Sequence, residues 1–176
     1  MDISIFAEGS GTTRNETEVP FRDYYQGNFR PISSLADQLE KYGTVDIHII
    51  SDNYGLVRGD EMVESYLSSN RNDKLDDSSI LNELYKGASS DVVVILLSTP
   101  TFNSLIMDNW SRIGEEAKSE SLWTLGAARS SLESISFDMI RRKGCNVITY
   151  ERVGVARISN KVREELLEAV KEASTS

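Results

Sequence analysis

The stretch Asp91-Val92-Val93-Val94-Ile95-Leu96-Leu97-Ser98 contains the longest apolar run of the chain. A strand buried on both faces shows such a continuous run, whereas a strand with one solvated face alternates apolar and polar residues. The run is far shorter than the roughly 20 apolar residues that a membrane-spanning helix needs. We therefore predict that residues 91–98 form a central strand of a parallel sheet, covered by helices on both sides.

On both sides of this predicted strand, segments rich in β-branched and aromatic residues alternate with segments of helical periodicity. Alternation of this kind favours a parallel sheet between two helical layers. We predict one domain over residues 1–176: a three-layer, doubly wound α/β fold, Rossmann-like, with a mostly parallel sheet of about five strands. The predicted strands are 2–7, 44–51, 91–98, 122–127 and 145–150. The predicted helices lie near 31–42, 60–67, 77–87, 101–117 and 130–143, and from 159 onward.

The composition excludes several classes of site. Arg and Lys total 19 against 28 Asp and Glu, which gives a formal net charge of −9. This acidity argues against broad binding to nucleic acid or to an anionic membrane. With one cysteine and one histidine, the chain has no internal disulfide framework, no CxxC metal site and no multi-histidine metal site. The N-terminus lacks a basic region followed by a long apolar core, so we expect a soluble, cytoplasmic protein.

The predicted topology selects a ligand-binding edge. In open α/β sheets, ligands bind beyond the carboxyl ends of the strands. Five loops of this sequence follow predicted strands and meet at that edge. They are residues 8–15, 52–55, 98–103, 126–130 and 151–154.

The first of these loops has the residue types of an anion-binding turn. Its glycines allow close backbone approach to a ligand, its hydroxyls can donate hydrogen bonds, and its arginine can pair with an anion. It has neither the Gly-Lys-Ser/Thr ending of a Walker motif nor a third glycine at GxGxxG spacing. A plain surface turn therefore stays the alternative. The predicted ligand-binding residues here are Gly9, Ser10, Gly11, Thr12, Thr13 and Arg14.

Three acids follow predicted strands and are the candidate catalytic residues: Glu8, Asp52 and Glu151. Carboxylates at this edge can accept ribose hydroxyls, hold Mg²⁺ or act as a general base. No metal-ligand set is assigned, and the cofactor stays unknown, with Mg²⁺ as one option. The alternative is a structural role, as turn residues or as ion-pair partners of nearby arginines (Arg14, Arg129 and Arg152).

Thr101, Asn103 and Arg129 complete the predicted ligand-binding set at this edge. Thr101 and Asn103 lie where a helix is predicted to begin after Pro100, and free N–H groups at such a position favour an anion. Ordinary N-capping by the Thr101 hydroxyl is the alternative. His48 and Cys145 lie within or at the start of strands, where packing roles are expected.

The segment Ile49-Ile50-Ser51-Asp52-Asn53-Tyr54-Gly55-Leu56-Val57, followed by Asp60-Glu61 and Tyr66, resembles a segment of the YaaA-like (peroxide-stress-response) superfamily. A similar domain occurs in archaeosine synthase-type tRNA-modification proteins. The resemblance covers residues 46–66 and extends more weakly to 1–100. It implies a Rossmann-like fold and a cleft that contains Ser51, Tyr54 and Gly55, with nucleoside or nucleic-acid-related ligands.

The sequence departs from that family soon after the first strand. Such relatives often carry Cys or Ser together with Lys there, whereas residues 8–14 hold neither Cys nor Lys. Ser10 and Arg14 are the nearest chemical equivalents.

The sequence is compatible with three functions. The first is binding of a small nucleotide-like ligand at the carboxyl edge, with hydrolase or glycosidase-like activity as an extension. The second is a non-catalytic sensor or interaction subunit that uses the same cleft. The third is nucleic-acid binding, which the family resemblance suggests and the charge opposes. No membrane partner is expected, and oligomer formation stays open.

Overall fold

The computed structural model describes residues 1–67, 77–152 and 157–175. In these residues a single sheet has the strand order β3-β2-β1-β4-β5-β6. All neighbouring strands are parallel except β2 and β3, which are antiparallel. The strands are β1 (Asp2–Glu8), β2 (Thr44–Ser51), β3 (Gly55–Arg58), β4 (Val92–Leu96), β5 (Leu122–Ala127) and β6 (Asn146–Glu151).

The predicted central strand is confirmed as β4. It pairs with β1 on one side and β5 on the other, and every residue of Val92–Leu96 is buried. Alternate residues of β4 enter two different cores, one on each side of the sheet. Helices cover both faces of the sheet at this strand, so no position faces water. This burial accounts for the continuous apolar run in the sequence.

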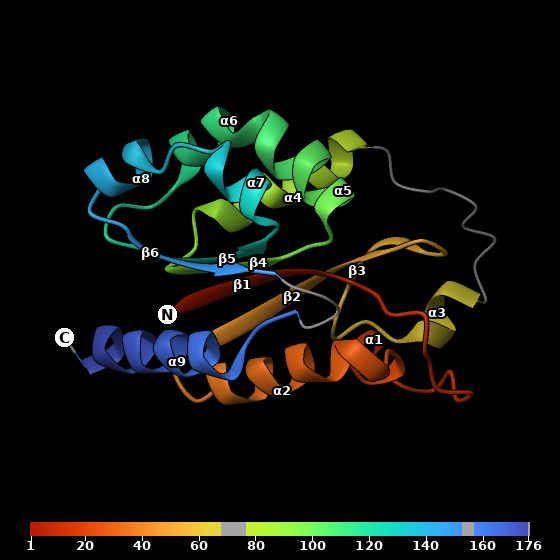
Figure 1. The fold of residues 1–176 in the computed structure, drawn as a ribbon. Coiled ribbons are helices and arrows are strands. Elements are labelled where there is room, and N and C mark those ends of the chain that lie inside the picture. Colours follow the sequence, from red (N-terminus) through yellow and green to blue (C-terminus); the bar gives the residue numbers. More distant parts are fainter. Residues whose placement is uncertain (68–76, 153–156, 176) are drawn as a thin grey trace.

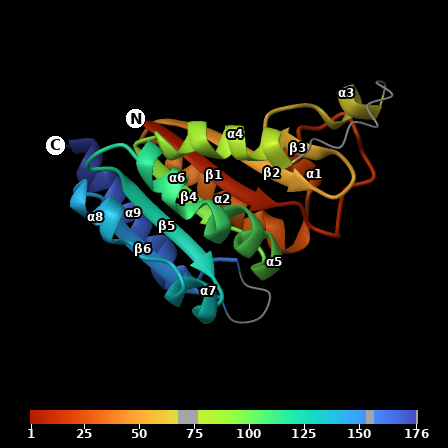
Figure 2. The same cartoon turned by 90° about the horizontal axis from the view of Figure 1, so that it is seen from above.

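Helices cover both faces of the sheet, which confirms the three-layer α/β architecture (Figure 1). On one face α2 and α9 lie side by side. On the other face α4 and α6 lie over the strands (Figure 2). The helices are α1 (Phe21–Tyr24), α2 (Arg30–Leu39), α3 (Val63–Leu67), α4 (Asp77–Ala88), α5 (Thr99–Thr101), α6 (Trp110–Glu116), α7 (Arg129–Glu133), α8 (Asp138–Arg142) and α9 (Asn160–Thr175). Among the described residues, none of the helices combines the length and apolar content needed to cross a lipid bilayer.

Strand β3 is absent from the strands predicted from the sequence. The predicted turn at 52–55 joins β2 to β3 as a hairpin, with Ser51 opposite Gly55. Gly55 has φ +73°, a left-handed conformation that favours glycine. The strand that follows has four residues, too few to show a period-2 pattern. Within the described residues the sheet therefore has one strand more than the five expected, and this edge strand pairs antiparallel with β2.

The helix predicted over residues 101–117 is divided, and it does not begin at Thr101. Thr99–Thr101 forms α5, a π-helical turn spans Phe102–Ile106, a 3₁₀ turn spans Met107–Asn109, and α6 follows. Ser98, rather than Thr101, is the residue that precedes the first turn. The helical turn begins before Pro100 because proline is tolerated in the first turn of a helix, where its missing N–H would have no partner within the helix.

Both residues with expected packing roles are buried. His48 is 4% exposed, and its ring stacks on Phe6 with a centroid distance of 4.4 Å. Burial is the main cause that lowers the pKa of His48 to about 4, and the nearby charge of Arg58 acts in the same direction. Cys145 is buried in the core beside Ser121.

Candidate functional site

The strand order fixes where a ligand site is expected. The five parallel strands, counted along the chain, lie in the order 2-1-3-4-5, with β3 added at one edge. In this order the chain connections change direction between β1 and β4, and ligands of such folds bind beyond the carboxyl ends of the strands near that point. The loops after β1, β2 and β4 therefore surround the candidate site.

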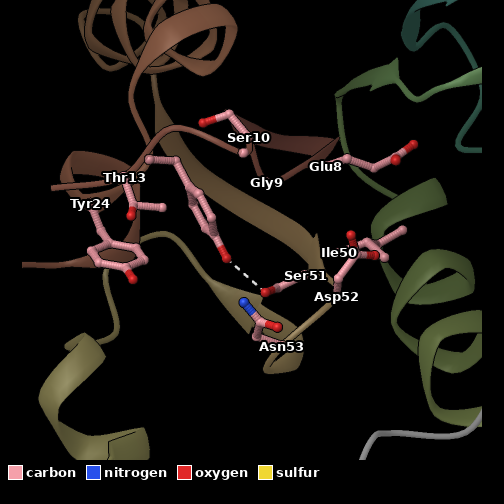
Figure 3. A pocket seen from close by; sticks show the side chains of 11 residues that line it. Glu8, Gly9, Ser10, Thr13, Tyr24, Ile50, Ser51, Asp52 and Asn53 are labelled. Atoms are coloured by element: carbon pink, nitrogen blue, oxygen red, sulfur yellow. Dashed lines mark hydrogen bonds between the residues drawn. The ribbon is translucent and has the colours of Figure 1, made fainter.

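A pocket of about 270 Å³ lies beyond the carboxyl ends of β1 and β2, and we call it the edge pocket. In the view of Figure 3, Glu8 and Asp52 lie on one side, and Tyr24 and Thr13 lie on the other. Its volume is slightly below the range of about 300–1,000 Å³ that is typical of small-molecule sites, which suits a small ligand. The edge pocket is lined by Glu8, Gly9, Ser10, Gly11, Thr13, Tyr24, Tyr25, Ile50, Ser51, Asp52 and Asn53.

Gly9 and Tyr25 build the inner wall of the edge pocket. The Gly9 N–H donates to the Ile50 carbonyl at 3.0 Å, which extends the β1–β2 ladder by one residue. A Cβ at Gly9 would lie 2.6 Å from the Tyr25 ring, so the ring packs directly against the glycine backbone. The Tyr25 hydroxyl donates to Ser51 Oγ at 2.7 Å, the dashed line in Figure 3. Burial raises the pKa of Tyr25, which therefore keeps its proton.

Glu8 is held in one orientation by the loop after β4. The Ser98 N–H donates to Glu8 Oε1 at 2.6 Å, and Ser98 Oγ donates to Oε2 at 3.0 Å. This carboxylate lies at the junction of β1 and β4, beyond the carboxyl end of β4. A fixed negative charge at this point disfavours a phosphate and favours a hydroxyl or amine donor.

Asp52 is exposed at the start of the β2–β3 hairpin, and it adds a second carboxylate to the edge pocket. It lies close enough to Tyr25 for its charge to contribute to the raised pKa of that hydroxyl, after burial as the main cause. Of the described residues, no arginine or lysine lines this pocket.

The third candidate acid, Glu151, lies apart from the other two. It ends β6, and β4 and β5 separate β6 from β1. Three inter-strand spacings of about 4.8 Å place it about 14 Å from the end of β1. Arg129 lies at that same end of the sheet and pairs with Glu133 at 3.0 Å. Part of the predicted loop 151–154 lies outside the described residues.

The predicted anion loop is divided by a β-bridge between Thr13 and Tyr25. Gly9, Ser10, Gly11 and Thr13 line the edge pocket, whereas Arg14 lines a different pocket. Side chains of an extended segment alternate between its two sides, so Thr13 and Arg14 face different pockets although they are adjacent in sequence. The Ser10 hydroxyl points to backbone carbonyls of its own neighbourhood, at Thr12 (2.8 Å) and Gln26 (2.6 Å).

The other predicted ligand residues have partners of their own. Tyr54 packs edge-on against Phe21 at 5.4 Å and is not in the lining of the edge pocket. Thr101 Oγ1 lies within hydrogen-bond distance of Ser98 Oγ, at 3.2 Å, and Asn103 Oδ1 accepts a hydrogen bond from Ser131 at 2.7 Å. Ser51 is therefore the only residue of the predicted Ser51, Tyr54 and Gly55 set that lines this pocket in the described structure.

Arg157 is a further residue of this edge that the sequence did not reveal. It is 7% exposed, and its Nη1 donates to the Glu8 carbonyl at 2.6 Å. Its Nη2 donates to the Gly9 carbonyl and to Asn28 Oδ1, both at 3.3 Å. Burial lowers the pKa of this guanidinium, and the nearby Arg152 charge acts in the same direction. Arg157 fixes the backbone from which Glu8 enters the pocket.

No group of three or more His, Cys, Asp or Glu residues is placed to hold a metal ion within the part of the chain that the structure describes. Binding of Mg²⁺ at Glu8 and Asp52 stays a prediction.

Comparison with solved structures finds two that align over nearly the whole chain with low TM-scores. No family model and no curated protein matches the chain. A diflavin flavoprotein A3 from Nostoc sp. is 12% identical, with 99% of this chain and 91% of that chain covered and a TM-score of 0.43. The D319A mutant of the PilB minor pilin from Streptococcus sanguinis is 8% identical, with 98% and 61% covered and a TM-score of 0.42. Neither structure is described as YaaA-like, so that resemblance stays a prediction.

Proposed function

We propose that the edge pocket binds a small hydroxyl-rich ligand without phosphate, of the nucleoside class. The observation that carries this proposal is the charge of the lining: among the described residues it includes the carboxylates of Glu8 and Asp52 and no cationic side chain. Carboxylates accept hydrogen bonds from vicinal hydroxyls, as found in ribose, and repel a phosphate.

The opposite side of the pocket suits a flat ring. Tyr24 and Tyr25 both line it, and their rings meet edge-on at 5.3 Å. Aromatic faces favour stacking with a planar, partly polar group such as a nucleobase. Asn53 adds an amide that can donate and accept hydrogen bonds with the edge of a base. The lining therefore combines acceptors for a sugar with an aromatic surface for a base.

Calorimetric titration tests this proposal. The four common ribonucleosides, their 2′-deoxy counterparts and their 5′-monophosphates would each be titrated into the full chain. We expect at least one ribonucleoside to bind, with its 2′-deoxy form weaker by about tenfold through loss of a hydrogen bond to a carboxylate. We expect the 5′-monophosphate to bind more weakly than the nucleoside, because the lining is acidic.

Matched variants separate the pocket from the rest of the surface. Asp52→Asn removes a lining charge, whereas Asp60→Asn removes the charge of an exposed aspartate outside the pocket. We expect weaker nucleoside binding for the first variant and unchanged binding for the second. Absence of binding by all ribonucleosides would contradict the proposal. Tighter binding of a monophosphate than of its nucleoside, with an affinity that changes in Asp52→Asn and therefore reports on the edge pocket, would contradict it too.

Hydrolysis of an N-glycosidic bond is a second candidate, favoured by two carboxylates in one pocket. Glycoside hydrolysis uses such a pair, one as acid or base and the other as nucleophile or base. Chromatography of nucleosides incubated with the protein would reveal a free base. We expect Glu8→Gln to abolish release of the free base. The glutamine side chain still has a carbonyl oxygen that can accept the hydrogen bond from the Ser98 N–H. A nucleoside that binds and stays intact would instead support a non-catalytic sensor.

A further inference from the structure

A second pocket of about 490 Å³ lies on the helical face where α2 and α9 begin, and we call it the helix-face pocket. Figure 1 shows these two helices side by side on the same face of the sheet. The Thr13–Tyr25 bridge separates it from the edge pocket. Its charged lining residues are Arg14, Arg22, Asp23, Arg30, Asp37 and Arg163.

One arginine of the helix-face pocket is neutralised within the protein. Arg22 forms ion pairs with Asp37 and with Glu40, the latter at 2.6 Å. It also donates to the Ser33 carbonyl at 3.3 Å. One arginine and two carboxylates give this cluster a net charge of −1, so it fixes the wall of the pocket and offers no unpaired cation to a ligand.

The other three arginines have no carboxylate partner among the described residues. Arg163 donates to Gln38 Oε1 at 2.8 Å and to Ser34 Oγ at 2.6 Å, so neutral acceptors hold its guanidinium in place. Arg14 and Arg30 are exposed, and no ion pair or hydrogen bond of their side chains is found in the described part of the chain. Of the residues that the structure describes, Asp23 is the one lining carboxylate outside the Arg22 cluster. The lining therefore has a local positive charge on a protein whose net charge is −9.

We propose that the helix-face pocket binds a small, multiply charged anion that carries phosphate groups. Guanidinium groups form paired, charge-assisted hydrogen bonds with phosphate oxygens. Arg14, Arg30 and Arg163 come from three separate segments and meet at one concave site, which suits a compact anion. An extended polyanion would need a stripe of cations, and the overall acidity would repel it. The first turns of α2 and α9 add the positive ends of two helix dipoles.

Titration of the full chain with inorganic pyrophosphate tests this site. Nucleosides are absent from this experiment, so its result is independent of the edge pocket. We expect saturable binding in calorimetry, with no equivalent heat from sodium chloride at equal ionic strength. Arg14→Gln and Arg30→Gln are each expected to weaken the affinity by about tenfold, the usual effect of losing one charge-assisted hydrogen bond. Both side chains are exposed, so folding should be unaffected.

Arg112→Gln is the matched control, because Arg112 is an exposed arginine of α6 on the other face of the sheet and pairs with Glu116. It removes the same charge and is expected to leave pyrophosphate binding unchanged. Equal weakening by all three variants would show a general charge effect and overturn the proposal. Absence of saturable binding would do the same. Tighter binding of a single-stranded oligonucleotide than of pyrophosphate, with loss in the same variants, would overturn the assignment to a small anion.

Discussion

The buried His48 makes the stability of this protein depend on pH in a predictable direction. Its pKa is about 4 in the folded chain, because burial disfavours the charged ring, against about 6.5 in an unfolded chain. Between these two values the unfolded state binds more protons than the folded state. The stabilisation is therefore complete above pH 6.5 and is lost as the pH falls toward 4.

The size of this effect follows from the two pKa values. Proton linkage predicts that the free energy of unfolding falls by about 2 kcal/mol between pH 7.5 and pH 5 through His48 alone. His48→Phe keeps an aromatic ring against Phe6 and removes the titrating group. Other groups titrate equally in both proteins, so the difference between the two isolates the histidine.

Urea denaturation of both proteins at a series of pH values measures this difference. We expect the stability of the original protein to fall more steeply than that of His48→Phe, by about 2 kcal/mol over this interval. If the free energies of unfolding of the two proteins changed in parallel with pH, His48 would have the same pKa in the folded and unfolded states. That result would refute its burial as an uncharged ring.

Three further predictions concern the wall of the edge pocket. Gly9→Ala places a methyl group 2.6 Å from the Tyr25 ring, so urea denaturation should show a loss of about 1–3 kcal/mol, and nucleoside binding should weaken. Tyr25→Phe removes the hydrogen bond to Ser51 and should cost about 1 kcal/mol in the same assay, with the fold retained by circular dichroism. Arg157→Met leaves the carbonyls of Glu8 and Gly9 without these donors; thermal unfolding should show a lower midpoint, and amide exchange should increase at Gly9. An unchanged midpoint and unchanged exchange would show that Arg157 does not hold this backbone.

The core of the fold could be predicted because its determinants are local. The run at 91–98 specifies a doubly covered strand by composition alone, and the β4 environment agrees with it. Sequence order and the rule for open α/β sheets then identified the edge at which Glu8 and Asp52 meet. These inferences needed no knowledge of contacts between distant side chains.

The finer geometry of the site depends on such contacts and could not be predicted. The Thr13–Tyr25 bridge divides the first loop, and nothing in residues 9–14 alone indicates that Tyr25 is its partner. Arg157 lies 149 positions from Glu8 along the chain, so its hydrogen bond to the Glu8 carbonyl has no local pattern. Strand β3 is stabilised by pairing with β2 rather than by its own four residues.

Nucleoside binding in the edge pocket is tested most directly by a titration of the full chain with the ribonucleoside that binds best, followed by ¹H–¹⁵N correlation NMR. We expect the largest amide shifts at Gly9, Gly11, Ser51 and Asn53, around the edge pocket. Shifts centred on Glu151 at the far end of the sheet, or no shifts at saturating nucleoside, would contradict it.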